Sequence, residues 1–232
     1  YADNAWGQSL AALASLIRTG QGVRVATVDL GGWDMHTQMG TATEGDFMKL
    51  TQGLAEGLAT FLKDLGPATD TTTVLVMSEF GRRVEQNASG GTDHGHGGVA
   101  MVMGAGVKGG LKGRWEGLAT LDQGDVPGTN DYRDLLAEVC MKRFGLSEAE
   151  IAPVFPGWKP TAVGAMARPE LRALGFAPPH DVPARAPGRA VVPPNANGRF
   201  PSGYRPLVCL SSWLGSSTLV LFVVICGAQE RA

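Results

Sequence analysis

Apolar side chains recur at the spacing of an α-helix in three stretches of the chain. They predict helices over residues 6–18, 47–65 and 129–144. Gly20 follows the first run, and Gly66-Pro67 closes the second. Thr129-Asn130-Asp131 supplies capping side chains at the start of the third. The apolar side of the third helix is predicted to carry Leu135, Leu136, Val139 and Cys140.

Three short apolar runs rich in β-branched residues lie between these helices, over residues 23–30, 71–77 and 99–103. Such runs, bounded by glycine or polar residues, indicate strands buried in a sheet. Strands that alternate with helices predict an α/β fold, a three-layer sandwich with a mostly parallel central sheet. In such sheets, ligands bind outside the carboxyl ends of the strands.

Side chains that can bind a metal ion follow the first two predicted strands. Asp34 and His36 lie in the glycine-led turn Gly31–His36, and Glu79 lies in the polar cluster Ser78–Arg82. Both positions fall at the carboxyl end of a strand, so we expect these side chains to meet at one edge of the sheet.

A third group of possible ligands stands in the glycine-rich stretch Thr92–Gly98, which contains Asp93, His94 and His96. These residues precede the third strand and must reach the same edge by way of a loop. Imidazole and carboxylate groups are the ordinary ligands of zinc, manganese and iron. The alternative is a pair of polar loops whose histidines cap backbone groups. The shared position at the sheet edge favours the metal site.

Composition narrows the functional classes only slightly. The 232 residues carry a formal net charge of −2 with scattered Lys and Arg, which gives no reason to expect a nucleic-acid partner. The three cysteines are too few and too badly spaced for a disulfide framework or a CxxC zinc site. No secretory signal is visible, and the start at Tyr1 indicates a processed chain or a fragment.

Four motifs in fixed order carry a resemblance to a known family over about residues 1–157. They are Gly31–His36, Ser78–Arg82, Gly91–Gly97 and Asp131-Tyr132-Arg133. Together they resemble the bacterial family called domain of unknown function 1501, which is placed in the alkaline phosphatase and sulfatase superfamily.

The superfamily implies two metal ions at the carboxyl ends of a central sheet. By resemblance, Asp34 and His36 match the Asp and His of one ion, and His94 or His96 its later histidine. Glu79-Phe80 stands where the other ion takes an Asp-His pair, although Asp93-His94 can also be read as that pair. The resemblance thus implies a divalent ion, zinc first, with manganese, calcium or iron as alternatives.

The resemblance implies hydrolysis of phosphate or sulfate esters. A divalent ion would support it, because the ion polarises an ester oxygen and activates water. Arg82, or Arg83, could pair with the oxyanion through its guanidinium. The alternative for Arg82 is a solvated charge or a salt bridge to a loop carboxylate. Ser78 is a weak candidate nucleophile, and Cys140 is a small core residue.

Two functions remain open at this point. The first is a metal-dependent hydrolase-like domain that acts on a small phosphate or sulfate ester. In the superfamily the nucleophile lies on the first strand, so this domain would be an N-terminally truncated alkaline phosphatase-like fold without its nucleophile region. The second is a non-catalytic, exported binding or scaffold protein. The resemblance implies a periplasmic or cell-envelope location for either.

The composition changes beyond the predicted domain of residues 1–158. Residues 159–206 hold most of the prolines and are predicted to form a disordered linker, so His180 is discounted as a ligand. Residues 207–228 carry no charge. They are interpreted as a shifted reading frame first, a marginal membrane anchor second, and a buried strand third.

Overall fold

A computed structural model describes residues 1–167, 208–210 and 218–225. Two long helices come first in the chain, as predicted. Helix α1 spans Ala5–Arg18, and the Asn4 side chain caps it by accepting from the Gly7 amide. Helix α2 spans Asp46–Leu65 and ends in a 3-10 turn, η1, at Gly66–Thr71. The buried residues of α2 fall on one face: Leu54, Leu58, Phe61 and Leu65.

The three predicted strands are present with boundaries shifted by one or two residues. They are β1 (Val25–Gly31), β2 (Thr72–Ser78) and β5 (Met101–Gly104). In β1, Ala26 and Val28 are buried and their neighbours are partly exposed, whereas residues 72–76 of β2 are all buried. Strand β2 is therefore covered on both faces, and this explains its unbroken apolar run.

A five-stranded sheet has the order β5-β2-β7-β1-β6, which includes β6 (Val208–Leu210) and β7 (Thr218–Ile225). Its pairing corrects the predicted mostly parallel sheet. Only β1 and β6 pair in parallel, while β1–β7, β2–β7 and β2–β5 are antiparallel. The predicted sheet assumed helical crossovers between neighbouring strands, but no helix of the described chain connects β2 to β5.

Strands β1 and β2 nevertheless point the same way, because both run antiparallel to β7 between them. Gly31 at the end of β1 pairs with Thr218, and Ser78 at the end of β2 pairs with Leu219. Their carboxyl ends therefore lie level at one edge of the sheet, about 10 Å apart across one intervening strand. The loops that follow β1 and β2 therefore start at the same edge of the sheet, as predicted.

The C-terminal predictions fall partly outside the described ranges. Residues 159–167 of the predicted linker are described, and residues 159–163 are exposed or partly buried, whereas Ala165 and Met166 are buried. The predicted disorder and His180 lie in residues 168–207, outside the described ranges. Within residues 207–228, residues 208–210 and 218–225 form strands β6 and β7, and the shifted reading frame stays a prediction. None of the helices in the described ranges combines the length and apolar character needed to span a bilayer.

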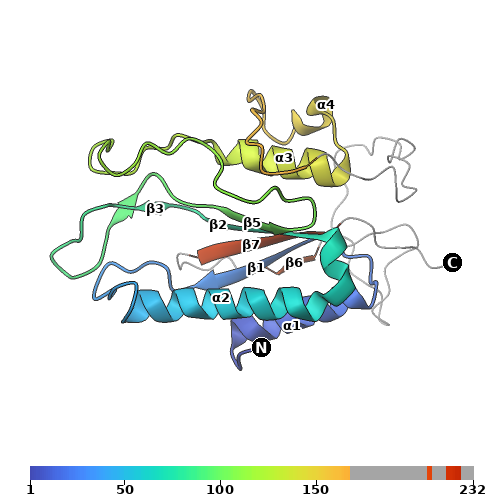
Figure 1. Ribbon diagram of the computed structural model, residues 1–232, viewed down its shortest axis with the longest axis horizontal. Coiled ribbons are helices and arrows are strands. Elements are labelled where there is room, and N and C mark those ends of the chain that lie inside the picture. Colours follow the sequence, from blue (N-terminus) through green and yellow to red (C-terminus); the bar gives the residue numbers. More distant parts are fainter. Residues whose placement is uncertain (168–207, 211–217, 226–232) are drawn as a thin grey trace.

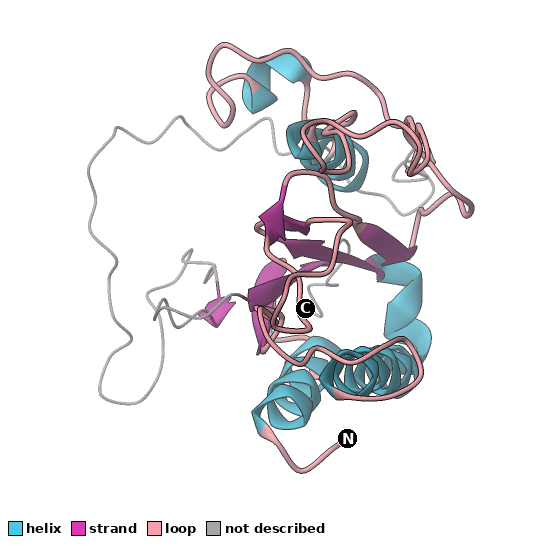
Figure 2. Ribbon diagram, turned by 90° about the vertical axis from the view of Figure 1, so that its left-hand side faces the viewer, coloured by secondary structure: helices cyan, strands magenta, loops and turns pink. Residues whose placement is uncertain are grey.

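Helices lie on both sides of the sheet, and α1 with α2 covers one face (Figures 1 and 2). The main core fills the space between them and includes Leu10, Phe61, Val74 and Val223. Helix α3 (Tyr132–Phe144) and the short α4 (Glu148–Ile151) lie on the other side. There Val139 and Met166 form a smaller cluster with Val102 of β5.

Helix α3 departs from its predicted apolar side in one respect. Leu135, Leu136 and Cys140 are only partly buried, while Ala137, Glu138 and Val139 are buried. The Glu138 carboxylate accepts from the amides of Gly164 and Met166. This contact ties residues 164–166 to the helix, so a charged residue is buried outside the four positions that were predicted to form the apolar side.

Candidate metal centre

Two loops at the common edge of β1 and β2 build the site. The first loop follows β1, and the second is a hairpin arm formed by β3 (Gly81–Arg82) and β4 (His94–Gly95). The loops are joined by backbone hydrogen bonds, including those from Gln38 N to Ser89 O at 2.9 Å and from Thr92 N to Met35 O at 3.1 Å. These bonds align the first loop beside the arm.

Gly91 makes the close approach of the two loops possible. A Cβ atom at this position would overlap the carbonyl group of His36 and the Met35 oxygen. Any larger residue would therefore push the arm away from the first loop. Gly91, the first residue of the Gly91–Gly97 motif, thus allows His36 and His94 to come together.

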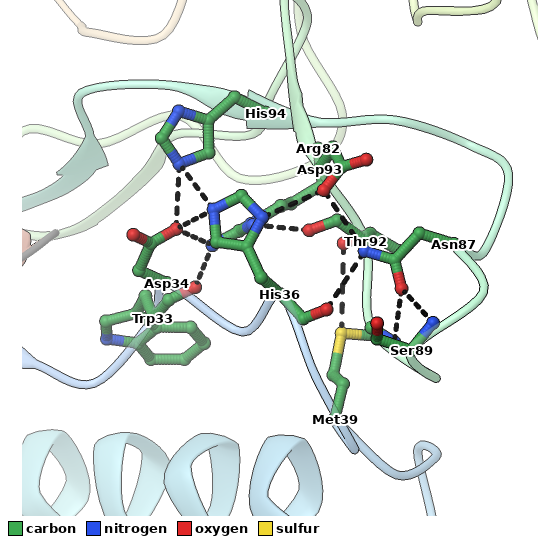
Figure 3. A network of polar contacts seen from close by, with 11 residues as sticks. Trp33, Asp34, His36, Met39, Arg82, Asn87, Ser89, Thr92, Asp93 and His94 are labelled. Carbon is green, nitrogen blue, oxygen red and sulfur yellow. Dashed lines mark hydrogen bonds and ion pairs between the residues drawn. The ribbon is translucent and has the colours of Figure 1, made fainter.

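Three possible ligand atoms converge where the loops meet (Figure 3). Asp34 Oδ1 lies 2.9 Å from His36 Nε2 and 2.7 Å from His94 Nε2. The two Nε2 atoms are 3.2 Å apart. A divalent ion with ligand bonds of about 2.0–2.1 Å holds adjacent ligands about 3.0–3.3 Å apart in octahedral or tetrahedral geometry. The three atoms thus fit one cation after outward shifts of a few tenths of an ångström.

The chemistry of these donors also fits a cation. A ring N–H points in one direction and cannot serve two acceptors equally well, whereas a cation can contact all three atoms at once. The side chains of Asp34, His36 and His94 are 38%, 41% and 50% exposed. Three protein ligands with one side open to solvent are typical of a catalytic rather than a structural metal site.

Asp93 lies on the opposite side of the His36 ring. Its Oδ1 contacts His36 Nδ1 at 2.9 Å and accepts from Asn87 Nδ2 at 3.1 Å. The hydrogen bond with His36, followed by the one from Asn87, holds the pKa of Asp93 below its ordinary value. The carboxyl group is consequently ionised at neutral pH and acts as a hydrogen-bond acceptor.

Arg82 is held between the two loops. Its guanidinium donates to the carbonyls of Trp33 and Thr92, each at 2.6 Å, and to Asp34 Oδ1 at 2.8 Å. The contact with Asp34 is the salt bridge to a loop carboxylate that the sequence left as an alternative for Arg82. Arg82 thus fixes the loops and orients Asp34, and an anion contact would come in addition to this role.

Phe80 supports the second histidine from the side. The rings of Phe80 and His94 stack with centroids 4.0 Å apart, and the Arg82 guanidinium carbon lies 4.8 Å from the Phe80 centroid. The Phe80 ring therefore restricts the orientation of the His94 imidazole.

Not all the predicted residues reach the three-atom group. Among the described residues, the group that could hold a metal comprises Asp34, His36 and His94, and neither Glu79 nor His96 is part of it. Glu79 is exposed, and the His96 ring lies against Gly128. Ser78 donates to the Phe80 carbonyl at 2.9 Å, as expected of a turn residue.

Asn87 is a residue of the candidate site that the sequence did not reveal. Its amide donates to the His36 carbonyl as well as to Asp93, and its oxygen accepts from the amides of Ser89 and Gly91. The run Asn87-Ala88-Ser89-Gly90-Gly91 signals a turn. It carries no signal of a partner that lies 51 residues earlier in the chain.

Fold and site together define a mixed α/β protein with an exposed histidine and carboxylate cluster at the edge of its sheet. A family model described as "Protein of unknown function (DUF1501)" matches residues 3–151, and the chain belongs to this family. The match spans all the residues of the cluster. No curated protein and no solved structure matches the chain.

Proposed function

We propose that the chain is a metal-dependent, hydrolase-like domain that acts on phosphate or sulfate esters. The observation that carries the proposal is the convergence of Asp34 Oδ1, His36 Nε2 and His94 Nε2, all within 3.2 Å of one another. The substrate class, membership of the alkaline phosphatase and sulfatase superfamily, and a periplasmic or envelope location rest on the resemblance of the four sequence motifs.

Asp34, His36 and His94 would hold the cation, with zinc as the first choice and manganese, calcium or iron as alternatives. A divalent ion there would supply Lewis acidity toward an ester oxygen or a water molecule. The exposed side of the cluster would admit a small ester. Phe80 restricts the His94 ring, and Arg82 holds the Asp34 carboxylate, so these two residues prearrange the donors.

Direct metal analysis of the purified chain tests the proposal. After chelation and equilibration with zinc, manganese, iron(II) or calcium in turn, we expect one tightly held ion per chain for at least one of them. The His36→Ala and His94→Ala variants should each lose that ion. His96→Ala should keep it, because His96 lies outside the three-atom group. Wild-type stoichiometry far below one for every metal would refute the proposal.

Hydrolysis of aryl phosphate and aryl sulfate esters is the second test. We expect turnover that requires the bound metal and is lost in His36→Ala. By the resemblance, the nucleophile of the superfamily lies on an earlier strand, so the same assay applies to any longer form of the protein.

A non-catalytic binding or scaffold protein is the second candidate function. The observation in its favour is that Arg82 is already engaged by two carbonyls and Asp34. Stoichiometric metal binding without turnover of either ester class would favour this candidate over the hydrolase.

A further inference from the structure

The contact between Asp93 and the His36 ring gives Asp93 a different role from the one suggested by the sequence. Asp93 Oδ1 lies 2.9 Å from Nδ1 of His36, whereas the other ring nitrogen, Nε2, faces Asp34 and His94. The two nitrogens of an imidazole point away from each other. The oxygen that contacts Nδ1 is therefore turned away from a cation bound at Nε2 (Figure 3).

The same contact favours a hydrogen on one of the two ring nitrogens. A carboxylate accepts hydrogen bonds and cannot donate one, so Asp93 favours a hydrogen on Nδ1, while Asp34 Oδ1, 2.9 Å from Nε2, favours one there. A cation between Nε2 and Asp34 would decide this competition, because it takes the Nε2 lone pair and leaves the one N–H of a neutral imidazole on Nδ1, facing Asp93.

We propose that Asp93 is a positioning residue for His36 and not a metal ligand, and that Asn87 holds Asp93 in place. This inference rests on the proposed function, because it gives Asp93 a task at the same metal site. A carboxylate behind a metal-bound histidine fixes the ring orientation and raises the basicity of the ligating nitrogen.

Asn87 forms hydrogen bonds with both residues of this contact, His36 and Asp93. Its Nδ2 group donates to the His36 backbone carbonyl at 2.9 Å and to the same Asp93 oxygen that meets the His36 ring. Its Oδ1 accepts from the amides of Ser89 and Gly91, which fixes the amide orientation. One side chain thus sets the position of Asp93 relative to His36.

The first experiment observes the His36 ring in metal-free protein. Long-range 1H–15N NMR correlations distinguish a proton on Nδ1 from one on Nε2, and His36→Ala identifies the His36 signals. We expect a larger share of the Nδ1–H form in the wild type than in Asp93→Ala, because Asp93 accepts from that nitrogen. An equal share in both proteins would overturn the inference.

The second experiment measures zinc binding by calorimetry and the visible spectrum of the cobalt(II) form. We expect Asp93→Ala to weaken zinc binding about 10- to 100-fold, the usual effect of losing a residue behind a ligand. Asp93→Asn keeps an acceptor for Nδ1–H and should recover part of the affinity. At saturating metal, both variants should keep the wild-type stoichiometry and cobalt(II) band intensities, which report the number of ligands.

Asp131→Asn is the matched control, because Asp131 is also a carboxylate held by a side-chain donor but belongs to the start of α3. It should bind zinc as the wild type does. Lower stoichiometry or a changed cobalt(II) spectrum in Asp93→Asn would identify Asp93 as a ligand and overturn the inference. A wild type that binds no metal would refute the proposed function instead, and the NMR result would still decide whether Asp93 fixes the ring.

Discussion

Replacing Glu138 with alanine should be among the most destabilising single changes outside the candidate metal site. The residue is only 6% exposed on α3, although it is charged. Its Oε1 accepts from the Met166 amide at 2.7 Å, and its Oε2 accepts from the Gly164 amide at 2.8 Å. Alanine would leave both amides without their acceptor.

The size of the effect follows from the exposure of the two amides. Met166 is 2% exposed, so its N–H cannot regain a water partner without local opening. Hydrogen bonds to a charged group contribute about 1.5–3 kcal/mol, and a buried unsatisfied donor costs about 1–3 kcal/mol. Gly164 is less buried and can be rehydrated. We therefore expect a loss of roughly 3–4 kcal/mol, a large share of the typical stability of about 5–15 kcal/mol.

Urea unfolding followed by tryptophan fluorescence and circular dichroism measures this loss. Asp134→Ala is the matched control, because Asp134 lies on the same helix and accepts from the amide of Thr161 at 2.7 Å at an exposed position. It should cost no more than about 1 kcal/mol, since water replaces the carboxylate. The proposed role of the two hydrogen bonds between Glu138 and residues 164–166 would be refuted by either of two results. The first is a loss of unfolding free energy below about 1 kcal/mol in Glu138→Ala, and the second is a loss no larger than that of Asp134→Ala.

Two further predictions concern the helix cap and the close approach of the loops. Hydrogen bonds from Arg133 hold the pKa of Asp131 below its ordinary value of 3.8. The ionised Asp131 carboxylate therefore stabilises the fold above pH 3.8, and this stabilisation is lost as the pH falls through the folded-state pKa. The difference in unfolding free energy between wild type and Asp131→Asn should be about 0.5 kcal/mol at pH 7 and shrink toward zero in acid urea titrations; a difference independent of pH would contradict the argument. Gly91→Ala should destabilise the protein by several kcal/mol and abolish zinc binding, because its Cβ would overlap the His36 carbonyl group. Gly53→Ala, in open space on α2, should be neutral or slightly stabilising by the same unfolding assay.

Much of the local structure follows from short-range signals. The boundaries of α1 and α2 are readable because apolar periodicity and capping or terminating residues act within one or two turns. The buried runs of β1 and β2 are readable for a similar reason, since β-branched residues between turn signals favour strands. Residue type and position after the predicted strands also selected six possible ligands, and three of them converge: Asp34, His36 and His94.

Long-range pairing could not be read in the same way. Strand β7 lies between β1 and β2 and is separated in sequence from β2 by about 140 residues, so no local pattern reveals its partner or direction. Apolar runs buried on both faces look alike in parallel and antiparallel sheets. The predicted mostly parallel sheet was wrong for this reason, even though the two loops did arrive at a common edge.

The sequence by itself determined the helices, the core strands and the types of donor available near the sheet edge, because these depend on neighbouring residues and side-chain chemistry. Only the tertiary structure decided which donors converge. It placed Asp93 behind His36, joined Arg82 to Asp34, and left Glu79 outside the three-atom group. These outcomes depend on how two loops pack across β7, and distances between segments far apart in the chain have no signature in a local pattern.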